Sequence, residues 1–280
     1  MSRAERTPGA GAAASAPAPD ASAAHGASAA SAPNIADSAG TPWAGRTLRP
    51  NPFSGDDGRA DPALRSALEA VAAAPLDPAA HTGVLTALRA ARLYAPVLPT
   101  AVEHVSDERG FVHDNRSEMA MVRLAAEDGR EATPCFTDIP ALTAWADAAR
   151  PVPIEAERMA AAAIEEGAQL LVLDPGTAHT FVVRRPALWA FIQGRAWTPA
   201  WADEAVARAC ARATAGLDWI DAAGVGPGTA QVGTAGPEVA LTLTCSRQPS
   251  AAELGVVQER LSANEVLAER ADSLTLSLRA

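Results

Sequence analysis

The chain has 280 residues, enough for one or two domains, and 48% of them are hydrophobic, so it can bury a core and form a globular protein. Its formal net charge of -10 disfavours a nucleic-acid partner, because proteins that bind the phosphate backbone concentrate positive charge on one face. All 23 basic residues are arginine, which excludes Schiff-base chemistry on a lysine amine.

The cysteines and the apolar runs indicate the compartment. Cys135, Cys210 and Cys245 are odd in number and far apart, which is typical of reduced core thiols and not of a disulfide framework. The N-terminus lacks the short apolar run of a secretory signal, and no run approaches the roughly 18 apolar residues of a membrane span. We therefore predict a cytoplasmic protein without a membrane partner.

Residues 1–58 differ in composition from the rest of the chain. Ala, Ser, Pro, Gly and Thr dominate them, with hardly a bulky apolar residue before Trp43. Such a segment cannot bury enough surface to offset its ordering entropy, so we predict a disordered tail. The stretch from Trp43 to Phe53 has aromatic residues that a partner could bind, although a plain solvated linker is the favoured interpretation.

Two dipeptides predict the first helices. Asp61-Pro62 and Asp77-Pro78 each place a carboxylate at the N-cap and a proline at the first helical position, where the missing N–H costs nothing. Each pair is therefore expected to begin a helix.

The rest of the main domain, residues 59–200, is predicted to be a mixed β-sheet with flanking helices. A long polar loop over 99–117 leads into it, Asp128-Gly129 predicts a tight hairpin, and the apolar run 170–173 predicts a strand buried on both faces. The predicted strands are 93–98, 118–125, 131–136, 170–173 and 180–183. The later helices are predicted after residue 137, over 154–166 and from residue 186.

Two of these helices raise expectations about single residues. Thr137 is expected to cap the helix that follows it. The helix that begins at Pro186 is expected to direct Leu188, Trp189 and Ile192 toward the core.

Residues 201–280 are predicted to form a smaller α+β domain. Strict alternation over 239–245 predicts a half-buried strand, and Ser250 with Glu253 predicts a capping box at the start of a helix. A final strand is expected over 274–278, with the helix covering one face of the strands. The predicted fold class of the whole chain is therefore α+β (α/β in its main domain).

Four short motifs occur in order along the main domain, at residues 116–122, 134–137, 171–176 and 185–189. They resemble the N-terminal domain of SseB-like proteins, the enhanced serine sensitivity family, and the similarity extends over about residues 78–200. The tail after 200 looks like the family's smaller C-terminal domain. The resemblance implies an α/β domain and a loose link to serine tolerance, but no established reaction. Pro140 stands where the family usually has an acidic residue, so a reciprocal helix cap is lost here.

Several groups of reactive side chains lack the spacing or the partners that a functional site needs. His104 and His113 bracket an acidic loop, but they lack the short ligand spacings of a zinc site. His179 near Asp174 resembles a base with its orienting carboxylate, yet no nucleophile occupies a diagnostic turn. The glycine-rich stretch 224–228 is predicted to be a connection, because a phosphate loop follows a strand and begins a helix.

Cys135 is a candidate thiol nucleophile. It stands at a strand end, where the N-terminus of the next helix would lower its pKa. Free cysteine is among the most buried residue types, so core packing is the favoured interpretation.

The best candidate site is composite and lies at the ends of the strands. If these ends meet, a helix N-terminus with free N–H groups faces a polar rim suited to a small anion or an amino-acid carboxylate. An arginine there would add a bidentate contact, although turn and cap residues that merely end strands are the more common explanation. The residues of this rim are Arg116, Ser117, Glu118, Thr137, Asp138, Asp174 and Gly176.

Two classes of function follow. The first is a non-enzymatic binding or regulatory module for a protein partner or a small anionic or amino-acid ligand. The second is an enzyme acting on an amino acid or thiol substrate near Arg116, Cys135 and Asp174. The sequence contains no complete set of nucleophile, base and orienting residue, which favours the first class and predicts neither a cofactor nor a metal.

Overall fold

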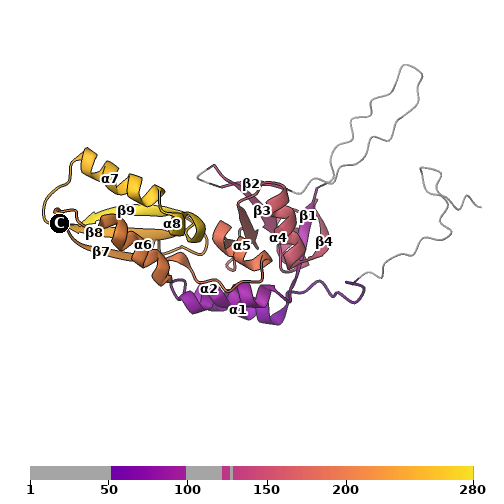
Figure 1. Ribbon diagram of the computed structural model, residues 1–280. Helices are drawn as coiled ribbons and strands as arrows, with labels where there is room; N and C mark the ends of the chain where they lie inside the picture. The colour runs from indigo at the N-terminus through magenta and orange to yellow at the C-terminus, as the bar shows by residue number, and fades with distance from the viewer. Residues whose placement is uncertain (1–51, 99–121, 127–128, 280) are drawn as a thin grey trace, which may run out of the picture. The chain divides into compact units, whose positions relative to one another are not determined.

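The computed structural model (Figure 1) describes residues 52–98, 122–126 and 129–279. The predicted tail up to residue 51 and the predicted loop 99–117, with its histidines and carboxylates, lie outside the described residues. Phe53–Ala280 form one compact unit, and its helices and mixed sheets confirm the α+β class.

The compact unit begins within the predicted tail. Asp56 contributes to this start, since its carboxylate accepts hydrogen bonds from Arg92 Nη2 at 2.7 Å and from the Tyr94 hydroxyl at 2.5 Å. Both partners belong to strand β1 (Arg92–Val97). Asp56 therefore belongs to the compact unit although it lies in the predicted tail, because polar contacts hold a segment that has little apolar surface to bury.

Helices α1 (Pro62–Ala73) and α2 (Pro78–Leu88) begin at the predicted prolines. The carboxylate of Asp61 accepts the N–H groups of Ala63 and Leu64 in the first turn of α1, and that of Asp77 accepts the N–H of Ala79 in α2. The two helices pack against each other and bury Leu64, Leu68, Val71, Val84, Leu85 and Leu88.

The main sheet has four strands in the spatial order β2-β3-β5-β6. These strands are β2 (Leu124–Ala125), β3 (Glu131–Cys135), β5 (Leu170–Leu173) and β6 (Phe181–Val183). β2 and β3 form the predicted hairpin, with Gly129 at a φ of 81° in its turn. β3 and β5 are parallel and β6 returns antiparallel, so the carboxyl ends of β3 and β5 meet at one edge.

A second, two-stranded sheet pairs β1 with β4 (Arg150–Glu155). The prediction of a helix from residue 154 is wrong at its start, because residues 154 and 155 belong to β4 and helix α4 is Ala156–Glu165. The prolines at 151 and 153 argued against a strand here, since proline within sheets is normally confined to the edges. An isolated bridge between Tyr94 and Phe136 connects β1 to the end of β3.

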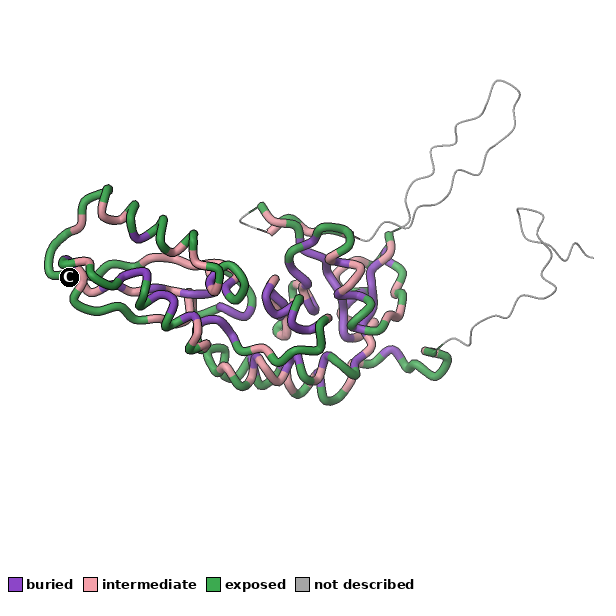
Figure 2. The backbone as a smooth tube through the Cα atoms, viewed as in Figure 1, coloured by how far each residue is buried: buried purple, intermediate pink, exposed green. Residues whose placement is uncertain are grey.

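One hydrophobic core joins one face of the main sheet to helices α1, α2, α4 and α5 (Arg185–Ile192). Figure 2 colours buried residues purple, and most residues of β3 and β5 are buried. The prediction that Trp189 points into this core is wrong, because 43% of the residue is exposed. The buried residues of α5 are Pro186, Ala187, Leu188, Ala190 and Phe191.

The C-terminal part of the unit has a second core. Its elements are η1 (Ala200–Ala202), α6 (Glu204–Thr214), β7 (Ile220–Pro227), β8 (Val239–Cys245), α7 (Ala251–Ser262), α8 (Glu265–Arg270) and β9 (Leu274–Arg279). β8 alternates as predicted and lies between antiparallel β7 and parallel β9. The capping box of Ser250 and Glu253 is present at α7. Helix α8, capped by Asn264, was not predicted.

The glycine-rich stretch 224–228 is not only a connection. Most of it belongs to β7, paired with β8 from Ile220 to Pro227. The prediction missed this strand because glycine and proline are depleted in strands, whereas pairing with the strongly apolar β8 outweighs that preference.

Candidate functional site

The carboxyl ends of β3 and β5 bring Thr137 and Asp174 into contact. The Thr137 backbone N–H donates to Asp174 Oδ1 at 2.7 Å, and the Thr137 hydroxyl donates to Oδ2 at 2.7 Å. Both residues are buried, with exposures of 0% and 1%. Both carboxylate oxygens thus bind the protein itself and tie two strand ends together.

Asp174 also organises the turn that follows β5. Its backbone has a φ of 44°, and its carbonyl accepts the hydroxyls of Thr177 at 3.0 Å and Thr180 at 2.8 Å. Gly176 lies in the same turn with a φ of 82°. Burial raises the pKa of the Asp174 carboxyl above its ordinary value, although the Thr137 hydrogen bonds oppose this shift.

Asp138, and not Thr137, caps helix α3 (Ile139–Trp145). Its carboxylate accepts the N–H of Ala141 at 2.7 Å and forms an ion pair with Arg65 of α1. The prediction that Thr137 caps this helix is therefore wrong, because the hydroxyl of Thr137 is bonded to Asp174 instead.

The structure thus describes only some of the residues of the predicted rim. Three of its members lie outside the described residues: Arg116, Ser117 and Glu118. The carboxylates of its described members bind neighbouring protein groups, as Asp138 does with α1 and α3. These interactions hold the strand ends in place, and a role in ligand binding stays a prediction.

The reactive side chains near this edge are those of Cys135 and His179. Cys135 is 0% exposed, its thiol donates to the Val172 carbonyl at 3.5 Å, and burial raises its pKa well above the ordinary value, with Asp174 adding to the shift. Within the described chain, His179 makes no hydrogen bond to Asp174 and its buried Nδ1 has no partner. This arrangement does not produce a thiolate nucleophile or an oriented base.

A pocket of about 560 Å³ lies over the other face of the main sheet. Alternation along the strands turns Leu170, Val172 and Val182 toward this face, while the residues between them enter the core. Leu124 and Ala132 extend the apolar floor. The segment Thr234–Pro237 and Ser273, both from the C-terminal part of the chain, form another wall, to which Thr234 and Ser273 contribute polar side chains.

The loop that supplies this wall is firmly attached to the sheet. The Gly233 carbonyl accepts the N–H of Val182 at 2.8 Å, so the loop adds to the edge of β6. Arg184 Nη2 donates to the carbonyls of Val232 at 2.9 Å and Gly236 at 3.0 Å. Hydrogen bonds within the protein therefore hold this wall of the pocket in place without a ligand.

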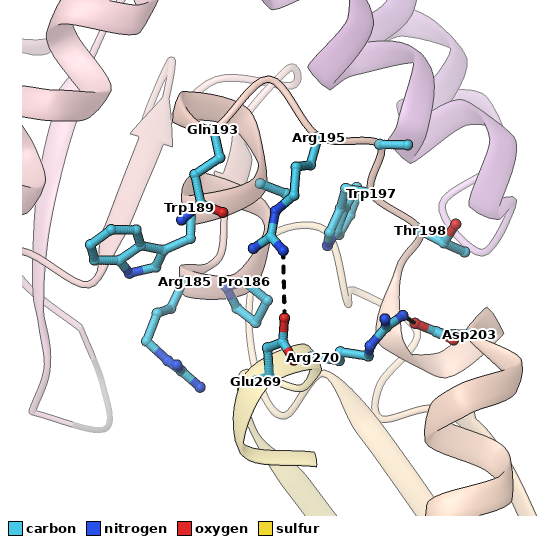
Figure 3. Close-up of a pocket in the computed structure, with 12 residues that line it drawn as sticks. Arg185, Pro186, Trp189, Gln193, Arg195, Trp197, Thr198, Asp203, Glu269 and Arg270 are labelled. Atoms are coloured by element: carbon cyan, nitrogen blue, oxygen red, sulfur yellow. Dashed lines mark hydrogen bonds and ion pairs between the residues drawn. The ribbon is translucent and has the colours of Figure 1, made fainter. Parts of the chain in front are cut away.

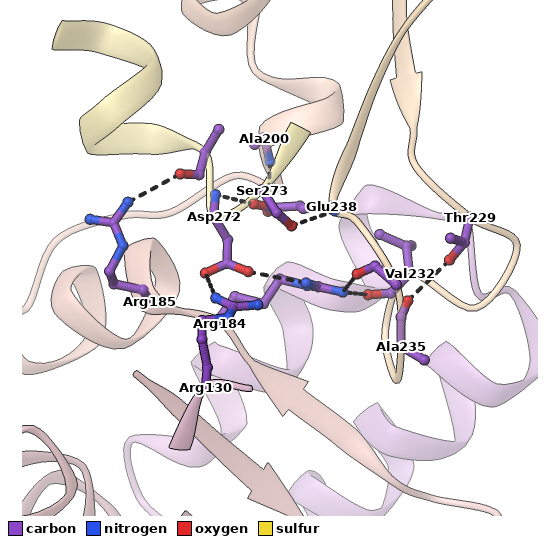
Figure 4. Close-up of polar contacts among 12 residues, drawn as sticks. Arg130, Arg184, Arg185, Ala200, Thr229, Val232, Ala235, Glu238, Asp272 and Ser273 are labelled. Carbon is purple, nitrogen blue, oxygen red and sulfur yellow. Dashed lines mark hydrogen bonds and ion pairs between the residues drawn. The ribbon is translucent and has the colours of Figure 1, made fainter. Parts of the chain in front are cut away.

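A buried network of charged side chains adjoins the pocket (Figure 4). Asp272 accepts from Arg130 Nη1 at 2.7 Å and from Arg184 Nη1 at 3.1 Å, so two guanidinium groups share one carboxylate. The Asp272 N–H donates to Glu238 Oε2 at 2.7 Å, and Glu238 is 0% exposed. Burial raises the pKa of Glu238, although the Asp272 N–H and Arg184 act to lower it.

Two guanidinium groups, those of Arg130 and Arg184, line this end of the pocket, where each also binds Asp272. Apolar walls with a few fixed polar groups are typical of small-molecule sites. The arrangement is suited to a ligand with an apolar body and an anionic group, the latter bound by arginine.

Sequence reasoning missed this site because its parts are far apart in the chain. Arg130 is next to the predicted hairpin turn, whereas Asp272 precedes the final strand 142 positions later. The side chains of Arg184 and Asp272 are buried and that of Arg130 is partly exposed, and nothing in a single sequence marks these three charged residues as members of one network.

Among the residues that the structure describes, no cluster of three or more His, Cys, Asp or Glu side chains could hold a metal ion. In the same part of the chain, no helix combines the length and apolar character needed to cross a bilayer.

The fold and the pocket define an α+β domain with a ligand-sized pocket between its sheet and a C-terminal loop. Residues 64–190 match the family model of the SseB protein N-terminal domain, so this part of the chain is an SseB-type N-terminal domain. The resemblance predicted from the four motifs is confirmed for this part. No curated protein and no solved structure shows a significant match.

Proposed function

We propose that this chain is a cytoplasmic, non-enzymatic binding module whose ligand is a small molecule with an apolar body and an anionic group. The observation that carries the proposal is the pocket on the main sheet, which combines an apolar floor with Arg130 and Arg184. Its volume of about 560 Å³ falls within the usual range of ligand sites.

The alternative, an enzyme at the strand ends, has less support. Cys135 is fully buried with a raised pKa, and the Asp174 carboxylate is occupied by Thr137. A catalytic role would require both groups to be released from the core. Under the proposal, Cys135→Ser leaves ligand binding unchanged.

The link to serine tolerance guides the choice of ligands to test. Serine is small and polar, whereas the floor of the pocket is formed by Leu124, Leu170, Val172 and Val182. We therefore expect apolar carboxylates to bind more tightly than serine itself, because they cover this floor as well as reaching the arginines.

Thermal unfolding of the full chain tests the proposal against serine, phosphoserine, octanoate and indole acetate. A ligand that binds only the folded state at a hundred times its Kd adds about 2.7 kcal/mol to the free energy of unfolding. We expect this effect for octanoate or indole acetate, with a clear loss in Arg130→Gln. The matched control is Arg158→Gln, an exposed arginine on α4 outside the pocket. No shift with any of the four compounds would contradict the proposal.

A further inference from the structure

Helix α5 exposes one large aromatic side chain on an otherwise buried helix. Trp189 is 43% exposed, while its neighbours Leu188 and Ala190 are buried. Arg185, Trp189 and Gln193 are spaced four residues apart, so they share one face of the helix. An indole ring is more stable when it is buried than when it is exposed to water, so this face is a candidate for contact with another molecule.

This face lines a groove of about 520 Å³ (Figure 3), separate from the pocket on the main sheet. The second side of the groove is the segment from Arg195 to Thr198, which contributes Trp197, and the third is formed by Glu269 and Arg270 of α8. In the view of Figure 3 the two indole rings lie on opposite sides of the Arg195 guanidinium group.

The charges of the groove differ from those of the whole chain. Its lining has three arginines and two carboxylates, on a protein with a formal net charge of -10. The lining carboxylates are paired: Glu269 lies 3.7 Å from Arg195, and Asp203 lies 2.9 Å from Arg270.

Arg185 is the cation that remains. Its Nη2 donates to the carbonyls of Ala268 at 2.8 Å and Ala271 at 3.2 Å, at the end of α8. No carboxylate in the described part of the chain forms an ion pair with it. The guanidinium is thus held in a fixed position without a neutralising charge, so an added carboxylate is favoured beside it.

We propose that this groove binds an acidic segment of a partner protein, with a proline or aromatic side chain against Trp189 and a carboxylate at Arg185. Tryptophan and arginine are among the residue types enriched at the hot spots of protein interfaces. The exposed Arg195–Glu269 pair has side chains that are 58% and 61% exposed, so it is weak and can open to admit a competing carboxylate.

Selection from a phage-displayed library of random peptides on the immobilised full chain tests this inference. The peptides that are enriched should combine Asp or Glu with proline or an aromatic residue. A synthetic copy of the most enriched peptide should bind Trp189→Ala and Arg185→Gln at least about tenfold more weakly than the native chain. Replacing its acidic residues by lysine should have the same effect.

Matched controls separate this effect from a loss of folding. Val256→Ala removes another exposed apolar side chain, on α7, and Arg208→Gln removes an exposed arginine on α6. Both should bind the peptide as the native chain does. Because Arg185 also binds the end of α8, Trp189→Ala is the decisive variant if Arg185→Gln unfolds.

Three outcomes would overturn the inference. The first is enrichment of peptides without acidic residues, and the second is peptide binding that survives Trp189→Ala. The third is a dimer in sedimentation experiments that Trp189→Ala dissociates, which would make a second copy of the chain the occupant. Octanoate should not displace the peptide, so the result is independent of the pocket on the main sheet.

Discussion

Replacing Asp272 by asparagine removes the negative charge that two arginines share. Asparagine keeps the shape of the side chain but cannot balance the charge of Arg184 or Arg130. The side chain of Asp272 is 0% exposed and that of Arg184 is 6% exposed, so water cannot take its place there. Arg130, whose side chain is 20% exposed, is closer to solvent and can relax.

The expected loss follows from the burial of these groups. Removing one partner of a buried ion pair costs about 3–5 kcal/mol, since it leaves an uncompensated charge in the protein interior. Because Arg130 can relax, we expect about 3 kcal/mol for Asp272→Asn. For a unit of this size that loss lowers the melting temperature by roughly 6–12 °C.

Urea unfolding followed by circular dichroism measures the loss. The matched control is Glu204→Gln, which breaks the exposed Arg208–Glu204 pair and should cost less than about 1 kcal/mol. The double variant Asp272→Leu with Arg184→Met should lose less than the sum of its single changes, since it leaves no unpaired charge from that pair. A loss below about 1 kcal/mol for Asp272→Asn would refute the reasoning.

Three further predictions concern other buried groups. Burial raises the pKa of Glu238, so the folded state holds this proton more tightly than the unfolded state does. The free energy of unfolding should therefore fall as the pH rises from the ordinary pKa of 4.5 to the raised pKa of the folded state. Urea unfolding across that pH range should show this decline in the native chain and not in Glu238→Gln. All three thiols, including Cys135, should react slowly with a thiol reagent in the folded chain and rapidly in urea, because each is buried. Fast labelling of Cys135 in the folded chain would support the enzymatic alternative. Asp56→Ala should lower the free energy of unfolding by about 1–3 kcal/mol, since it removes a carboxylate that accepts hydrogen bonds from Arg92 and Tyr94. An unchanged unfolding curve would show that residues before 59 do not stabilise the unit.

Local signals in the sequence were sufficient for many of the elements. The Asp-Pro pairs at 61 and 77, the hairpin at Gly129 and the capping box at Ser250 each satisfy backbone groups within a few residues, so their effect does not depend on distant packing. The alternation of β8 was equally informative, because one face of that strand is buried.

The features that the sequence did not predict depend on contacts between distant parts of the chain. β4 and β7 contain prolines or glycines that argue against strands, and only pairing with β1 and β8 reveals them. Thr137 has the chemistry of a helix cap, but its hydroxyl is bonded to a carboxylate 37 positions away. Trp189 fits an apolar helix, and its exposure depends on which side of α5 meets the sheet. Long-range contacts decided each case, and a single sequence does not contain them.

The pocket on the main sheet is the central claim, and calorimetric titration of the full chain with anilinonaphthalene sulfonate tests it most directly. This probe has an apolar ring system and a sulfonate, the two features that the pocket should recognise. Val172→Trp places an indole on the floor of the pocket, and Val152→Trp makes the same change on β4, where Val152 is 38% exposed and outside the pocket. We predict saturable binding that Val172→Trp weakens at least about tenfold and Val152→Trp preserves. Equal binding by both variants would contradict the account.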